Sequence, residues 1–294
     1  MKDVFFCPKC EKPLQNQGKA YSCNACGKRF EEENGIILFV VDIDKKEVSY
    51  PPAFYEKQIK IERKHFWCVG RNNIILNFLS KVAKSKNVRI LEIGCGEGNV
   101  LCFLEKDGYH VEGGDILLEG LEKSRSRTDS KLYRCDISHL PFRNSFDIIG
   151  AFDILEHIDD DIGALKSVNK ALRENGAIIL TVPAGKGLLP LETVHKRRYS
   201  KKELIDKLKK AGFKVNKISY YMFFLFPIVL IVRWMKSLFL KEPDLDKGIN
   251  ELKIIPIIND ICIFLLFVER TMLKYINFPI GVSLIVTAIK ENPS

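Results

Sequence analysis

The 294-residue chain lacks any run of the roughly twenty apolar residues that a helix needs to span a bilayer. Its longest apolar run, Met222 to Val232, has eleven residues, contains Pro227 and closes at Arg233. The opening residues have no apolar stretch of signal-peptide length. Internal repeats are absent as well. We therefore expect a cytoplasmic protein rather than a membrane-spanning or secreted one.

The composition excludes wholesale disorder. Apolar residues make up 46% of the chain and charged residues 28%, which is ordinary for a globular protein with a core of usual size. The net charge of +9 favours anionic partners such as nucleic acid, phosphorylated lipid or a membrane surface. Lysine is spread along the whole chain, however, so a generally basic enzyme is the alternative reading.

The cysteines are not arranged as a disulfide framework. Nine are present, an odd number, and four of them stand in two tight pairs near the N-terminus. This distribution suits a reducing compartment and one metal site. The remaining five are scattered: Cys68, Cys95, Cys102, Cys135 and Cys262.

The two pairs predict a zinc ribbon. Cys7-Pro-Lys-Cys10 and Cys23-Asn-Ala-Cys26 are separated by twelve residues, and Gly27 suits the tight turn after the second pair. Each pair can turn two thiolates towards one ion, and four thiolates complete a tetrahedral shell. A closed shell leaves no position for water, so we interpret the Zn²⁺ as structural.

Three zones follow one another along the chain. Residues 1–41 form the zinc ribbon and end in an apolar strand at 35–41; residues 42–52 are a polar linker with two prolines. Residues 53–294 form the large domain, which begins with a helical pattern over 53–86. An apolar helical insertion is expected at about 221–272.

Strands and helices alternate through the large domain, which predicts an α/β fold with a doubly wound, mostly parallel sheet. Strands are expected at 88–93, 109–113, 131–134, 146–152, 177–182, 213–220 and 282–289, and helices at 99–106, 118–127, 160–172 and 200–211.

A glycine-rich turn between the first strand and helix of that domain indicates a nucleotide site. The spacing is Gly94-x-Gly96-x-Gly98, which brings a ligand close to bare backbone. Glu92 precedes the loop, where a carboxylate suits a cationic amino-acid ligand better than a pyrophosphate. Asp115 follows Gly94 by 21 residues, at the end of the second strand, where it can accept both ribose hydroxyls.

Residues 89–99 resemble motif I of class I S-adenosylmethionine-dependent methyltransferases, and later segments keep that family's order. Residues 135–142 resemble the adenine-binding segment, residues 146–157 resemble motif IV, and residues 176–183 resemble the following strand. The resemblance implies a seven-stranded Rossmann-like sheet and S-adenosyl-L-methionine as cofactor. It also implies these cofactor contacts: Arg71, Glu92, Gly94, Cys95, Gly96, Gly98, Asp115, Ile116, Asp136, Ile137 and Phe152.

Methyl transfer needs an acceptor aligned with the methyl–sulfur bond, and a base if the acceptor is a hydroxyl. Candidate catalytic residues are His157, His195 and Glu156, which lie after strands where ligands of such sheets bind. Asp153, Glu156 and His157 also resemble the divalent-cation set of ubiquinone-biosynthesis O-methyltransferases, with the shorter Asp in the first place. Both readings stay open at this point.

The acceptor is less well defined. The N-terminal module resembles the zinc ribbons of small methyltransferase-activating proteins, and residues 278–286 resemble the last strand of type-11 methyltransferases from surface-glycan and lipid pathways. We therefore expect transfer to an O or N atom of a small-molecule, lipid or glycan acceptor. An RNA methyltransferase that uses the ribbon to recognise RNA is one alternative, and a non-enzymatic partner-binding protein is another. Residues 220–240 are interpreted as a core or lid helix or as a peripheral membrane contact.

Overall fold

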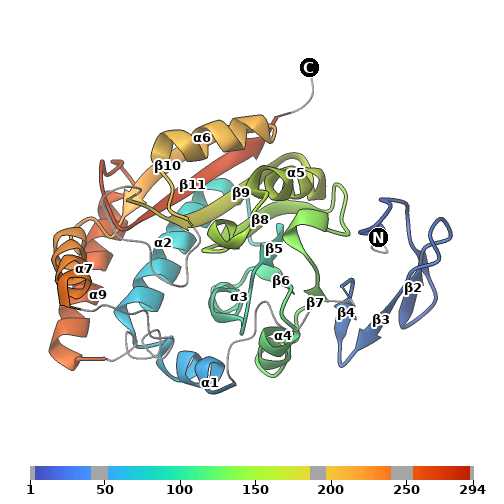
Figure 1. Cartoon of the computed structure of the whole chain (residues 1–294), viewed down its shortest axis with the longest axis horizontal. Helices are drawn as coiled ribbons and strands as arrows, with labels where there is room; N and C mark the ends of the chain where they lie inside the picture. Colours follow the sequence, from blue (N-terminus) through green and yellow to red (C-terminus); the bar gives the residue numbers. More distant parts are fainter. Residues whose placement is uncertain (1–3, 41–51, 186–196, 240–253, 292–294) are drawn as a thin grey trace.

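The computed structural model describes residues 4–40, 52–185, 197–239 and 254–291. A twisted sheet runs through the molecule, with helices on both of its faces (Figure 1). The zinc ribbon lies at one end of the sheet, and the helices of the apolar insertion lie at the other. This is the doubly wound α/β architecture that the alternating pattern predicts.

Seven strands of the large domain form the predicted sheet, in the order β7-β6-β5-β8-β9-β11-β10. Pairing is parallel from β7 to β9, whereas β11 runs antiparallel to both of its neighbours. The central strands are apolar and almost wholly buried, as helices on both faces require. Their bounds are β5 Arg89–Ile93, β6 His110–Asp115, β7 Leu132–Arg134, β8 Phe146–Phe152, β9 Leu172–Pro183, β10 Phe213–Tyr221 and β11 Ser283–Lys290.

Helices cover the sheet in two groups, each with its own buried cluster. One face carries α2 (Phe66–Val82), α3 (Asn99–Lys106) and α4 (Leu118–Arg125), and the other carries α5 (Asp161–Ala171) and α6 (Lys201–Lys210). Helix α6 is capped by Ser200, whose Oγ accepts a hydrogen bond of 3.2 Å from the backbone N–H of Glu203. The helical zone predicted over 53–86 divides into α1 (Pro52–Ile61) and α2.

The ribbon joins the main sheet instead of standing apart from it. Its strands are β1 Gln15–Asn16, β2 Ala20–Ser22, β3 Arg29–Glu33 and β4 Ile36–Leu38. Strand β4 falls within the run predicted at 35–41, and it pairs in parallel with β7, so the sheet has eleven strands rather than seven. Aromatic rings pack across this junction: Phe5, Phe39, Tyr133 and Phe142. Residues 41–51, almost all of the predicted linker, lie outside the described residues.

The apolar insertion contains α7 (Phe226–Phe239) and α9 (Pro256–Met272). The second apolar stretch noted in the sequence lies inside α9. Among the residues that the structure describes, none of the helices combines the length and the apolarity needed to cross a bilayer.

Candidate active site

The glycine loop makes a tight turn between β5 and α3. Gly94, Gly96 and Gly98 all have φ in the left-handed region, at 82°, 51° and 83°, where side chains with a Cβ are strained. A Cβ on Gly94 would come within 2.6 Å of Ile154, and one on Gly98 within 2.6 Å of Ser124. A Cβ on Gly96 would meet nothing within 4 Å. Gly96 therefore faces the open side of the loop, where a ligand can approach the backbone.

Asp115 joins the loop to the second strand. One carboxylate oxygen accepts the backbone N–H of Gly96 and the other accepts that of Leu117, each at 2.8 Å. The residue is buried, and this burial raises the pKa of its carboxyl group, against the opposing effect of the backbone donors. A carboxylate has about four lone-pair sites, so two remain for hydroxyl groups of a ligand. This is the position and chemistry predicted for the ribose contact.

Two buried polar atoms beside the loop have no hydrogen-bond partner in the part of the chain that the structure describes. One is the acceptor Oε2 of Glu92, and the other is the donor Nε of Arg71. Burial raises the pKa of Glu92 to about 8, although the charge of Arg71 opposes that shift. Buried polar groups are normally paired, and the amino-acid part of S-adenosylmethionine would supply an ammonium and a carboxylate. The donor set therefore fits this cofactor.

The residues predicted to contact the adenine follow β7. Asp136 accepts the backbone N–H of Ser138 at 2.8 Å and thereby caps a short 3₁₀ turn, in which Ile137 is buried. The backbone N–H of Cys135 donates to the carbonyl of Asp115 at 2.9 Å. The two predicted cofactor carboxylates, 21 positions apart in sequence, are thus held by adjacent strand ends.

The other predicted contacts lie in different settings. Ile116 is 36% exposed, directly after Asp115, and remains available to a ligand. Cys95 is buried, its N–H donates to the carbonyl of Gly114, and its carbonyl accepts the backbone N–H of Gly98, so both of its backbone polar groups are paired within the turn. Phe152 packs inside the core cluster that includes α2. Its ring lies against Gly150 on the same strand. The contact of Phe152 with the cofactor stays a prediction.

At the carboxyl end of β8, Asp153 pairs with Arg71, with 2.8 Å between Oδ2 and Nη1. Its other oxygen accepts a hydrogen bond of 3.0 Å from Thr181, and its φ of 54° is left-handed. The family resemblance implies a cofactor contact for Arg71 and a place in a divalent-cation set for Asp153. The ion pair between them, 82 positions apart, could not be read from either motif alone.

The predicted catalytic residues separate into three situations. Glu156 is fully buried, and burial together with Asp153 raises the pKa of its carboxyl group well above its usual value. His157 is partly exposed, with Nε2 lying 3.9 Å from Oε1 of Glu156. His195 lies outside the described residues. Within those residues, the four N-terminal cysteines are the one set whose ligand atoms are close enough to share a metal, and the cation reading of Asp153, Glu156 and His157 stays a prediction.

Residues 197–199 anchor this turn. Arg197 pairs with Asp161 at 3.0 Å, and the hydroxyl of Tyr199 donates to Asp161 at 2.9 Å, with the carbonyl of Leu155 as a second acceptor at 3.2 Å. Arg198 is buried and donates to the carbonyl of Ala184. These contacts give Arg197 and Arg198 a structural role at the end of β8.

The four thiols of the ribbon form a compact set. All four sulfurs lie within 4.8 Å of one another, with Cys7 and Cys26 at 3.6 Å and Cys10 and Cys23 at 3.4 Å. A tetrahedral zinc with bonds of 2.3 Å requires sulfurs about 3.8 Å apart, so the set fits Zn²⁺.

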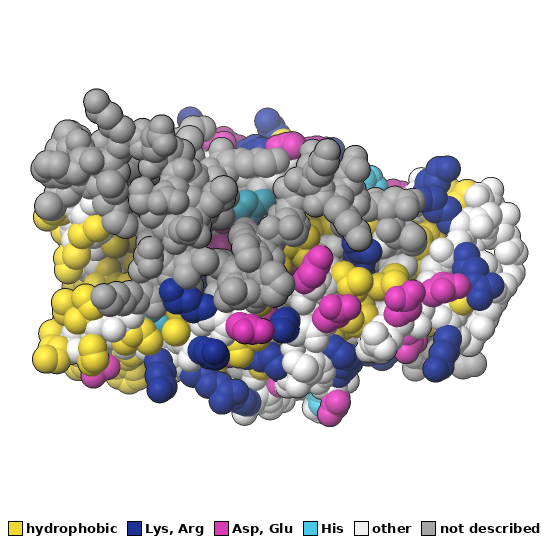
Figure 2. All heavy atoms as spheres, turned by 60° about the horizontal axis from the view of Figure 1, so that its bottom comes forward, with side chains coloured by type: hydrophobic (Ala, Val, Ile, Leu, Met, Phe, Trp, Pro, Cys, Tyr) yellow, Lys and Arg dark blue, Asp and Glu magenta, His cyan; other side chains and the backbone are white. Residues whose placement is uncertain are grey.

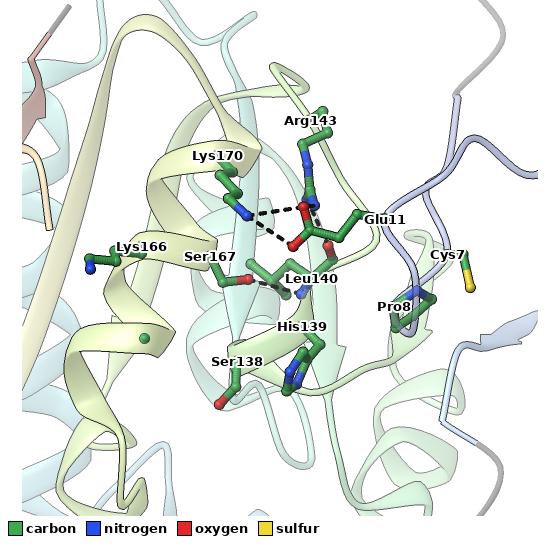
Figure 3. Close-up of a pocket in the computed structure, with 11 residues that line it drawn as sticks. Cys7, Pro8, Glu11, Ser138, His139, Leu140, Arg143, Lys166, Ser167 and Lys170 are labelled. Carbon is green, nitrogen blue, oxygen red and sulfur yellow. Dashed lines mark hydrogen bonds and ion pairs between the residues drawn. The ribbon is translucent and has the colours of Figure 1, made fainter. Parts of the chain in front are cut away.

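A cleft of about 220 Å³ separates the ribbon from the adenine side of the large domain (Figure 3). Glu11 of the first cysteine turn reaches across it to Lys170 of α5, at 2.9 Å, and to Arg143, at 3.1 Å. The short turn with Ser138 and His139 lines the same cleft. The first cysteine turn is therefore held against the large domain by the ion pairs of Glu11 as well as by the pairing of β4 with β7.

Comparison with known proteins identifies the family. The model of a methyltransferase domain matches residues 62–218, more than half of the chain. The chain belongs to this methyltransferase family. It is 29% identical over 114 residues to malonyl-[acyl-carrier protein] O-methyltransferase of Pseudescherichia vulneris, an alignment that covers 38% of this chain and 45% of that protein. It is 31% identical over 123 residues to tRNA U34 carboxymethyltransferase of Sulfurimonas denitrificans, covering 37% and 40% respectively.

A solved structure shares the fold of the methyltransferase domain. It is phosphoethanolamine N-methyltransferase 2 of Haemonchus contortus in complex with S-adenosyl-L-methionine, with a TM-score of 0.53 and 19% identity over 86% of this chain and 61% of that one. The chain spans less than half the length of the two curated relatives named above. The family and the class I Rossmann-like fold are confirmed.

Proposed function

We propose that this protein transfers a methyl group from S-adenosyl-L-methionine to an O or N atom of a small-molecule, lipid or glycan acceptor. The observation that carries the proposal is the pair of unpartnered buried atoms, Glu92 Oε2 and Arg71 Nε, beside the open face of Gly96. An ammonium and a carboxylate on one ligand would satisfy both atoms. Pairing by such a ligand would offset the free-energy cost of burying these two atoms.

Different residues would bind different parts of the cofactor. Asp115 accepts the ribose hydroxyls, Asp136 and Ile137 hold the adenine, and the ends of β5 and α2 hold the amino-acid part. The bound cofactor supplies an electrophilic methyl group on a sulfonium. The protein's contribution is alignment and the exclusion of water, and both depend on the rigid loop and on the turn that follows β8.

His157 is the proposed base among the described residues. It lies at the carboxyl end of β8, where the sheet order reverses between β5 and β8, and it is 35% exposed in its side chain. Glu156 stands behind it with a carboxyl group that burial keeps protonated to a higher pH than usual. We therefore assign Glu156 a positioning role and His157 the removal of the acceptor proton.

We also propose that the zinc ribbon supports cofactor binding. Strand β4 pairs with β7, the backbone N–H of Phe39 donates to the carbonyl of Arg134 at 2.9 Å, and Cys135 is bonded to the carbonyl of Asp115. The ribbon thus covers the strand that leads directly into Asp136. An exposed edge strand pairs poorly and frays, so the ribbon would hold the adenine segment in place.

Labelled transfer tests the activity. Protein would be incubated with methyl-tritiated S-adenosylmethionine and, in parallel, a lipid extract, a glycan fraction and total RNA. The proposal expects label in the lipid or glycan fraction or in small molecules, and a loss of more than about a hundredfold with His157→Gln. Asp206→Asn, an exposed carboxylate on α6, is the matched control and should transfer normally.

Label recovered chiefly in RNA would replace the proposed acceptor with the RNA alternative. Binding of the cofactor without transfer to any fraction, with or without His157, would leave the partner-binding alternative in its place.

A further inference from the structure

Helix α9 presents polar residues inward and apolar residues outward, the reverse of an ordinary surface helix. On the inner side, Asn259 and Glu269 are buried. On the outer side, Ile257 is 76% exposed and Phe264 is 65% exposed, with Ile261 between them on the same helical face. The spacing 257, 261, 264 places these three side chains in one stripe.

The inner contacts fix the rotation of α9. Asn259 accepts the backbone N–H of Phe66 and donates to the carbonyl of Lys64, each at 2.8 Å, which ties α9 to the start of α2. Glu269 accepts the backbone N–H of Phe223 at 2.9 Å, just before α7. Leu266 lies so close to Gly70 of α2 that a Cβ there would come within 2.3 Å. The helix cannot turn its apolar stripe inward without breaking these contacts.

The stripe belongs to a larger apolar surface shared with α7. On α7, Ile228, Ile231 and Val232 are exposed by 56%, 59% and 44%. The space-filling view shows hydrophobic side chains gathered at this end of the molecule, with basic side chains beside them (Figure 2). Clustered exposure of this kind marks an interaction surface, whereas isolated apolar residues do not.

The charges around this surface, which we call the α7–α9 face, are mainly positive. At the C-terminal end of α9, Lys81 donates to the carbonyl of Lys274, and Lys217 donates to the carbonyl of Leu273. Tyr275, next in the chain, is 84% exposed. Among the described residues of α7 and α9, Asp260 is the one exposed acidic side chain. An apolar face beside lysines and an exposed tyrosine complements anionic headgroups above a hydrocarbon layer.

We propose that the α7–α9 face docks on the surface of a bilayer that contains anionic phospholipids. A second copy of this chain is a poorer occupant, since among the described residues of α7 and α9 it would bring Asp260 alone as an exposed acidic partner for the same lysines. The docking face lies on the far side of α9 from Gly70, and Arg71, the next residue of α2, reaches the candidate active site. Docking would therefore hold the methyltransferase domain at a membrane surface, where lipid-linked acceptors lie.

Vesicle co-sedimentation of the full chain tests the proposal. Vesicles of phosphatidylcholine alone would be compared with vesicles that also contain phosphatidylglycerol. We expect binding to the anionic vesicles, weakening as salt screens the lysines. Ile261→Asp and Phe264→Asp should each weaken binding by at least about tenfold, since each removes apolar contact and adds a like-charged group. Lys274→Ala should weaken it by about fivefold.

Val4→Asp is the matched control, because Val4 is 57% exposed on the ribbon, away from this face. It should bind as the unchanged protein does. Equal binding by Ile261→Asp and the unchanged protein would overturn the proposal. So would sedimentation equilibrium that shows a dimer dissociated by Ile261→Asp, without vesicle binding. The same variants should still bind S-adenosylmethionine. A variant that binds the cofactor but not the vesicles has lost docking alone, and the proposed activity is then unaffected by that result.

Discussion

Binding of S-adenosylmethionine should release a proton from Glu92. Burial raises the pKa of this carboxyl group to about 8, so at pH 7 about nine tenths of the molecules carry the proton. The cofactor's ammonium requires the ionised form, and binding should therefore release about 0.9 proton at pH 7. The released proton is taken up by the buffer, so the measured enthalpy should change with the buffer's heat of ionisation.

Calorimetric titrations in phosphate and in Tris at pH 7 measure this effect. The unchanged protein should show a buffer-dependent enthalpy, whereas Glu92→Gln should bind more weakly and show none. Glu122→Gln, an exposed residue of α4, should behave as the unchanged protein. Equal enthalpies in the two buffers for the unchanged protein would refute the assignment of Glu92 as a protonated group that ionises on binding.

The same carboxyl group makes stability depend on pH. The folded chain holds the proton on Glu92 up to about pH 8, while the unfolded chain releases it near 4.5. Between these values the folded state binds the Glu92 proton and the unfolded state does not, so Glu92 alone should lower the free energy of unfolding as pH rises, by at most about 1.4 kcal/mol per pH unit. Urea unfolding at pH 5 and pH 8 measures this slope. Glu92→Gln should make it shallower, and an unchanged slope would contradict the assignment.

Further predictions concern the loop and the ribbon. Gly96→Ala should fold, with a loss of about 1 kcal/mol from its left-handed φ, yet bind S-adenosylmethionine at least tenfold more weakly, because its methyl group enters the ligand's space. Gly94→Ala should lose more stability, since it also meets Ile154 at 2.6 Å; equal unfolding midpoints for the two would contradict this distinction. Removal of zinc with a chelator, or Cys23→Ser, should lower both the unfolding temperature and the affinity for S-adenosylmethionine. If zinc is lost and the affinity for S-adenosylmethionine is unchanged, the proposal that the ribbon supports cofactor binding is wrong.

Much of the large domain could be predicted from the sequence because its signals are local. Buried parallel strands appear as short apolar runs, and the strand at 146–152 and the helix at 99–106 have the predicted bounds. The glycine loop and Asp115 were also recognisable, since a left-handed turn demands glycine and the carboxylate sits at a fixed distance along the chain. The structure places these groups together, as expected.

The features that escaped prediction depend on partners far away in sequence. The apolar run at 35–41 signals a strand, but nothing in it identifies β7, almost a hundred residues later, as the neighbour. Arg71 and Asp153 each fit a motif, and their ion pair follows only from the packing of α2 beside β8. The outward orientation of the apolar stripe on α9 is likewise set by Asn259 and Glu269, whose buried contacts are tertiary.

The most direct test of the proposed cofactor site is calorimetric titration of zinc-loaded protein with S-adenosylmethionine and S-adenosylhomocysteine, beside Asp115→Ala. We expect saturable binding of both ligands at one site per chain, and loss of that binding in Asp115→Ala with the fold intact by circular dichroism. Absence of binding by the folded, zinc-loaded protein, or equal binding by Asp115→Ala, would contradict the proposed site.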